Sequence, residues 1–225
     1  MNSVASKAAL GLAGAGGAVG GGFLIKNHIS PEDKRSTIKD LISKSKTKVA
    51  VTKDEGWSKL WDKYKKDNEN KGAGKDSWKL AEWKGSNNPD TIPSSYKMRC
   101  TSLSSERVEG ESDSKYVEFL NMCSRDKTVG DLLSGSTLLP KGNGNDAKWK
   151  SRFKKYKEAK GDQSSYPIGA IALDAGDSEE KPEHLKKLQD GCATQWSKSV
   201  TGEEDRSYLE AIREWCSAEV TKNDQ

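Results

Sequence analysis

Four cysteines are the residues of this 225-residue chain whose type and spacing could do chemistry. A thiol can form a disulfide, bind zinc, or act as a nucleophile beside a histidine. A zinc site usually takes two ligands a few residues apart, and no pair of these cysteines has that spacing. Pairing of Cys192 with His184 for catalysis is formally available, but no motif supports it. Structural disulfides are therefore the favoured interpretation.

The cysteines belong to a pattern that occurs twice. Trp57 precedes Cys100 by 43 positions, and Trp149 precedes Cys192 by the same 43 positions. Four cysteines allow three connectivities, and sequence alone does not choose among them. The duplication favours pairing within each copy, because a duplicated unit should fold with its own bond. The favoured pairs are Cys100–Cys123 and Cys192–Cys216.

Helices are expected to position these cysteines. Each copy carries aromatic residues at positions i, i+4 and i+7, which share one face of a helix, and mostly Lys, Arg, Asp and Ser between them. Such a stripe could be an exposed platform for sugars or single strands, but it is more often a buried face. We expect a structural role for the stripe and for the tryptophan beside the last cysteine. These aromatic residues are Trp57, Trp61, Tyr64, Trp149, Phe153, Tyr156 and Trp215.

Further helices are predicted from capping and periodicity. Ser30 and Pro31 are typical of a helix start, which predicts a helix over 29–48. Its segment Thr37–Ser43 matches Thr128–Ser134, which is a second similarity between the two copies. We also predict a short helix around 78–83 and a helix over 183–189. Each copy closes with an amphipathic helix that ends in a cysteine, whereas 168–173 could be helix or strand.

The composition leaves little material for a core. Hydrophobic residues make up 32% of the chain and charged residues another 32%, so aromatic anchors and cross-links must carry much of the stability. The net charge is +4, with both signs interleaved, and no nucleic-acid partner is predicted. The helix of the second copy is basic, and a solvated face is the favoured interpretation. The alternative is an anionic-ligand face formed by Lys150, Lys154 and Lys157.

The N-terminal stretch is apolar. Ala8–Ile25 runs for 18 residues without a charged or strongly polar side chain, which is close to the minimum for a membrane-spanning helix. An uncleaved anchor is the favoured interpretation, and a cleaved signal peptide or a flexible soluble leader are the alternatives. The first two interpretations export the rest of the chain, in agreement with disulfides.

The polar residues form none of the common catalytic motifs. The sequence contains no H-E-x-x-H, Walker A, G-x-S-x-G or EF-hand motif. The stretches 142–146 and 174–180 hold acids and amides that could contact a cation, and they are interpreted as ordinary loops. We therefore predict no catalytic residue, no metal site and no cofactor, and a protein that is not an enzyme. An exported hydrolase is an alternative, against which the presence of only two histidines counts.

The arrangement of these motifs resembles the large paralogous families of surface proteins encoded by haemotropic mycoplasmas. The resemblance covers most of the chain, and its strongest pieces are Thr128–Leu133 and Trp215-Cys216. One departure is Met122 before Cys123, where the motif has Trp. The resemblance implies an anchored, surface-exposed and antigenically variable protein, in families for which no activity is established. We predict a non-catalytic role in host interaction or antigenic variation.

Together these observations predict a mostly α-helical protein with an N-terminal signal or transmembrane anchor over 1–28. Two tandem disulfide-stapled helical units follow, over 29–125 and 126–225. The predicted location is the cell membrane, with a single span and an extracellular ectodomain. The predicted partners are the membrane and a host surface component or antibody, an adhesin for anionic glycans is an alternative, and the oligomeric state stays open.

Overall fold

The computed structural model describes residues 34–52, 54–85, 90–142, 144–161, 163–219 and 224, and the described chain from Arg35 onward forms one compact unit. The anchor predicted over 1–28 lies outside the described residues. Among the helices that are described, none is long and apolar enough to cross a membrane. The described chain is mostly helical, and it contains both disulfides, as predicted from the sequence.

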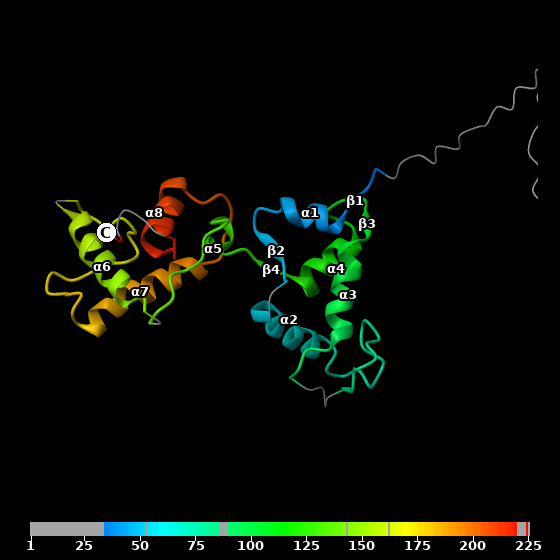
Figure 1. Cartoon of the computed structure of the whole chain (residues 1–225). Helices are drawn as coiled ribbons and strands as arrows, with labels where there is room; N and C mark the ends of the chain where they lie inside the picture. Colours follow the sequence, from blue (N-terminus) through cyan, green and yellow to red (C-terminus); the bar gives the residue numbers. More distant parts are fainter. Residues whose placement is uncertain are drawn as a thin grey trace, which may run out of the picture. The chain divides into compact units, whose positions relative to one another are not determined.

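Copy one, which we define as residues 35–126, contains four helices and two short antiparallel strand pairs among its described residues (Figure 1). Strand β1 pairs with β3, and β2 pairs with β4 through Ala50 opposite Ser124. The elements are β1 (Ser36–Thr37), α1 (Ile38–Lys44), β2 (Lys48–Ala50), α2 (Asp54–Asp67), α3 (Ser94–Ser104), β3 (Arg107–Val108), α4 (Ser114–Cys123) and β4 (Ser124–Asp126).

Copy two, residues 127–219, repeats the same order of helices. Single β-bridges join Thr128 to Ser199 and Leu138 to Ser217, at the places where copy one has its two strand pairs. The structure therefore extends the repeat beyond the motifs visible in the sequence. The helices are α5 (Val129–Leu132), α6 (Asp146–Lys160), α7 (Pro182–Ser197) and α8 (Arg206–Cys216).

The prediction of one helix over 29–48 is wrong in its described part, because α1 begins later and ends earlier than predicted. Helix α1 begins only after Thr37, whose hydroxyl accepts the N–H of Asp40 while the Asp40 carboxylate accepts the N–H of Thr37. This capping box fixes the start, and Thr37 itself is extended because it pairs with β3. At the other end, Lys48 begins β2. The same box, formed by Thr128 and Asp131, begins α5.

Each copy has its own hydrophobic core, and the aromatic stripe runs through it. Trp61 and Tyr64 in copy one have no exposed surface, and the same holds for Phe153 and Tyr156 in copy two. Trp57 and Trp149, which begin the two stripes, are also buried. The stripe is thus a packing face of α2 and α6, and its aromatic rings offer no exposed platform.

The middle segments of the copies contain loops in place of regular elements. Residues 78–83, predicted as a short helix, form turns, because the Asp76 carboxylate accepts the N–H of Leu80 and Lys79 adopts a positive φ of 51°. Residues 168–173 are neither helix nor strand. The helix predicted over 183–189 lies within α7.

Candidate functional site

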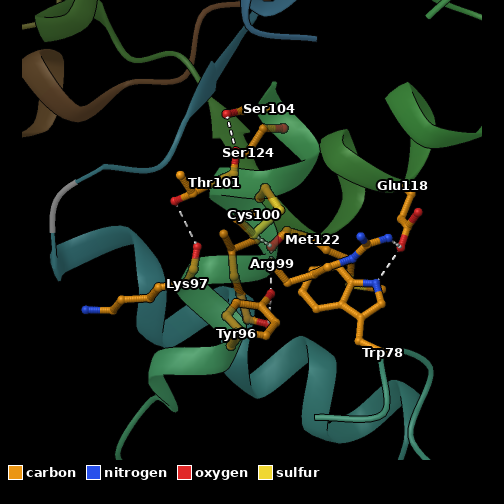
Figure 2. The surroundings of a disulfide bond; sticks show 12 residues. Trp78, Tyr96, Lys97, Arg99, Cys100, Thr101, Ser104, Glu118, Met122 and Ser124 are labelled. Carbon is orange, nitrogen blue, oxygen red and sulfur yellow. Dashed lines mark hydrogen bonds and ion pairs between the residues drawn. A yellow bond between two sulfur atoms is a disulfide. The ribbon is translucent and has the colours of Figure 1, made fainter. Parts of the chain in front are cut away.

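The disulfide of copy one joins the middle of α3 to the last residue of α4. Cys100 and Cys123 have Cα atoms 5.5 Å apart, and both side chains are buried (Figure 2). The carbonyl of Cys123 accepts the N–H of Val51 at 2.9 Å. The disulfide therefore joins two helices, and the hydrogen bond from Val51 holds the residue after β2 at the same point.

Copy two has the same arrangement. Cys192 in α7 is bonded to Cys216 at the end of α8, with Cα atoms 5.3 Å apart. The carbonyl of Cys216 accepts the N–H of Leu139 at 2.9 Å, which matches the bond between Val51 and Cys123 in copy one. The pairing is thus within each copy, and a disulfide loop of this length stabilises by about 3 kcal/mol in the chain-entropy model.

Tyr64, the last aromatic residue of the stripe in copy one, organises the loop after α2. Its hydroxyl donates to the buried carboxylate of Asp76 and accepts the N–H of Trp78 at 3.0 Å. Burial, together with the hydrogen bond to Asp76, raises the pKa of Tyr64 far above its usual value. The buried side chain of Asn68 completes the network by accepting the N–H of Ser77 at 2.8 Å.

Tyr156 plays the same part in copy two with different partners. Its hydroxyl lies 2.9 Å from the carbonyls of both Ile168 and Ile171, and it accepts the N–H of Ile168 at 3.2 Å. Its ring stacks on Tyr166, with centroids 5.1 Å apart. The same tyrosine position therefore holds a loop through a side-chain carboxylate in copy one and through backbone carbonyls in copy two.

The aromatic ring that packs edge-on against this tyrosine comes from a different helix in each copy. In copy one, Tyr96 of α3 packs edge-on against Tyr64, with centroids 5.2 Å apart, and its hydroxyl donates to the carbonyl of Met122 at 2.6 Å. In copy two, Trp215 of α8 packs edge-on against Tyr156 at 5.1 Å. The pair Tyr96 and Met122 thus corresponds to Leu188 and Trp215, which explains how copy one packs without the tryptophan of the motif.

Figure 2 shows a second layer of contacts over the disulfide of copy one. The indole N–H of Trp78 donates to the carboxylate of Glu118, and the guanidinium of Arg99 lies 5.9 Å from the centre of the Trp78 ring. Arg99 is also 3.8 Å from Glu118. These contacts attach the loop that Tyr64 organises to α3 and α4.

The three lysines proposed for an anionic-ligand face differ in their surroundings. The ammonium of Lys157 donates to the carbonyls of Ala175 and Asp177, and Lys150 lies 2.6 Å from Glu180. Lys154 is exposed. Two of the three cations thus serve contacts with the loop between α6 and α7, and a ligand would have to compete for them.

A buried arginine on the same helix was missed in the sequence. Arg152 has no exposed surface, and its guanidinium bonds both carboxylate oxygens of Asp224, at 2.6 and 2.9 Å. The same guanidinium donates to the carbonyls of Ser217 and Glu219. The equivalent position in copy one is Leu60, a core residue, so comparison of the copies could have placed Arg152 on the buried face.

These arrangements of described residues position loops against the helices. Within the described ranges, no group of three or more His, Cys, Asp or Glu side chains could hold a metal ion. No protein family, curated protein or solved structure matches this chain. The repeated disulfide frame and the loops that differ between its copies are therefore the candidate functional features.

Proposed function

We propose that this chain is an exported, non-catalytic surface protein, in which a repeated helical frame presents copy-specific loops to host components or antibodies. The observation that carries the proposal is the pair of buried disulfides, one in each copy. Disulfides form and persist in oxidising surroundings and are rare in the reducing cytosol. An anchor over residues 1–28 would keep such a protein at the membrane.

The loops after α2 and α6 differ between the copies, which supports a role in presenting variable loops to host components. The elements that carry the disulfides are alike, whereas the loop after α2 is held through the carboxylate of Asp76 and the loop after α6 through the backbone carbonyls of Ile168 and Ile171. Sequence change at the exposed positions of these loops is compatible with a constant frame, because each loop is held by its own buried residues, such as Leu80 and Trp83 in copy one and Ile168 and Ile171 in copy two. A protein that varies under antibody pressure needs this separation of frame and loop.

Protease treatment of intact cells tests the location. We expect the chain to be degraded on intact cells at the same protease concentration that degrades it after lysis, while a cytosolic marker survives in the intact sample. A chain that survives on intact cells and is degraded only after lysis would contradict the surface assignment.

The redox state of the native protein tests the observation that carries the proposal. Alkylation of the protein in freshly opened cells, followed by intact mass before and after reduction, counts free thiols. We expect none before reduction and four after it, since all four cysteines are paired. Four free thiols before reduction would place the protein in a reducing compartment.

Retention on a heparin column tests the glycan alternative. Exchange of Lys150 and Lys154 for Glu would abolish retention if these cations bind an anionic glycan, since phosphate- and sulfate-type ligands are bound through summed positive charge. Retention that is unchanged by the exchange would leave non-specific attraction as its cause. A matched exchange of two exposed lysines in copy one, Lys59 and Lys66, controls for the change in net charge.

A further inference from the structure

His184 is a titratable residue that the proposed function does not use. Its Nδ1 accepts the backbone N–H of Ser178 at 3.0 Å, and its Nε2 lies 3.5 Å from the carboxylate of Asp177. Since Nδ1 accepts a hydrogen bond, it carries no proton, and the proton of the neutral ring must lie on Nε2, facing Asp177. The geometry thus requires one particular neutral form of the ring.

We propose that His184 is a pH-sensitive latch, which holds the turn at Ser178 while the imidazole is neutral and releases it when the imidazole is protonated. An imidazolium donates from both nitrogens, so its Nδ1 cannot accept the N–H of Ser178. Protonation and this hydrogen bond exclude one another. Acid therefore favours the open turn, because only the open turn is compatible with both ring protons.

His184 is the third residue of α7, and its own N–H donates to the carbonyl of Lys181 at 3.0 Å. The backbone of His184 is therefore fixed in the first turn of the helix while Nδ1 faces Ser178 and Nε2 faces Asp177. Protonation changes the contact at Nδ1, where a ring N–H would meet the N–H of Ser178.

Several charged groups near the ring also pair with one another. On the loop, Asp174 and Asp177 both bind the ammonium of Lys187 from α7 at 2.7 Å. Burial alone would raise the pKa of Asp177, but the hydrogen bonds from Lys187 and from the N–H of Asp174 outweigh burial and lower it below the usual range. From α6, Lys157 bonds the carbonyls of Ala175 and Asp177, while Lys150 pairs with Glu180.

These ion pairs and hydrogen bonds limit the part of the loop that is released in acid. The loop up to Asp177 is attached to α6 through Lys157 and to α7 through Lys187, independently of His184. The turn that follows has its own bond, from the N–H of Lys181 to the carbonyl of Ser178 at 3.2 Å. Release is therefore confined to the turn 178–181, at the exposed end of the loop that copy two presents.

An NMR titration of the full chain from neutral to mildly acidic pH tests the latch. We expect the amide signal of Ser178 to move with the same midpoint as the ring nitrogens of His184. Exchange of this amide, corrected for its intrinsic pH dependence, should become about fivefold to tenfold less protected, the equivalent of one hydrogen bond. In His184→Asn the amide oxygen takes the place of Nδ1 and cannot be protonated, so the Ser178 signal should stay constant.

Two results would overturn the proposal. One is a Ser178 amide that does not respond while the ring titrates, or that responds equally in His184→Asn. The other is a neutral ring with its proton on Nδ1, which the wild-type protein reveals by its ring nitrogen shifts even where the variant fails to fold. Both measurements use the ring and amide signals alone, so they are independent of the surface location proposed above.

Discussion

At the scale of single residues, one tyrosine hydroxyl in each copy ties a helix to the loop that follows it. Tyr64 donates to the carboxylate of Asp76, whereas Tyr156 bonds backbone carbonyls. Both hydroxyls are buried, so neither can exchange its protein partner for water when that partner is lost. The chemical difference between the partners leads to a prediction.

Replacement of Tyr64 by Phe should destabilise copy one by about 2 kcal/mol, because it removes the hydroxyl donor of a buried carboxylate that then keeps only the N–H of Leu80. Chemical denaturation followed by tryptophan fluorescence measures the loss. Tyr116→Phe is the control, since it changes another buried tyrosine of copy one outside this network. Equal losses in the two variants would show that the hydrogen bond to Asp76 contributes nothing particular.

Asp131 leads to a prediction on pH dependence. Burial alone would raise its pKa, but hydrogen bonds from Arg125 and from the N–H of Thr128 prevail and lower the pKa to about 2. A carboxylate with a lowered pKa stabilises the fold above the pKa of the unfolded chain, about 4, and loses this contribution as pH falls toward 2.

Comparison of the wild type with Asp131→Asn isolates this contribution. The difference in unfolding free energy should be largest at neutral pH and should shrink as the pH falls from about 4 to 2. Thermal or denaturant unfolding across this range measures it. A constant difference would mean that Asp131 acts through its shape and hydrogen-bonding pattern alone.

At the scale of elements, the salt bridge between Arg152 and Asp224 shows how one position of the repeat can hold different chemistry. Helix α2 has Leu60 in its core where α6 has a buried arginine. The guanidinium of Arg152 donates to the carbonyls of Ser217 and Glu219, which follow α8, and Asp224 supplies the opposite charge. A buried charge of this kind is costly once its partner is lost.

A double-mutant cycle should reveal that cost. Asp224→Asn should destabilise copy two by about 3 kcal/mol, because the buried guanidinium keeps its charge and loses its counter-ion. Arg152→Leu, which installs the residue of copy one, should recover most of this loss when combined with Asp224→Asn. Denaturant unfolding of the four proteins measures the cycle, and additive losses would contradict coupling between the two residues.

The repeat determined how much of these elements could be predicted from the sequence. The helices that carry aromatic stripes and cysteines have a clear period, and the structure contains them as α2, α4, α6 and α8. The start of α1 could not be placed, because Ser30-Pro31 and Thr37 both resemble helix starts and tertiary pairing with β3 favours the second.

The loops were less predictable for a different reason. The sequence around Trp78 has the spacing of a short helix, but the turn there depends on Tyr64 and Asp76, which are brought together only by the fold. Arg152 looked like its basic neighbours, because charge in a sequence does not reveal burial. The predictions for the membrane anchor and for the surface role remain predictions.

At the scale of the whole molecule, two small cores each carry one disulfide. We expect Cys100→Ser/Cys123→Ser to lower the stability of copy one by about 3 kcal/mol and to leave the hydrogen-exchange protection of α6 to α8 nearly unchanged. Mass spectrometry of peptides after exchange measures protection element by element. Equal loss of protection in both copies would show that the two cores unfold as one.

The disulfides also bear on what happens when the chain is pulled. An extended chain spans about 3.5 Å per residue, so the 23-residue separation between Cys100 and Cys123 would yield about 80 Å of length under tension. The covalent bond replaces that length with a Cα–Cα distance of 5.5 Å, and Cys192–Cys216 does the same in copy two. A force applied between the ends of either copy can therefore extend only the segments outside the bridged loop, and α4 and α8 stay attached to their partner helices.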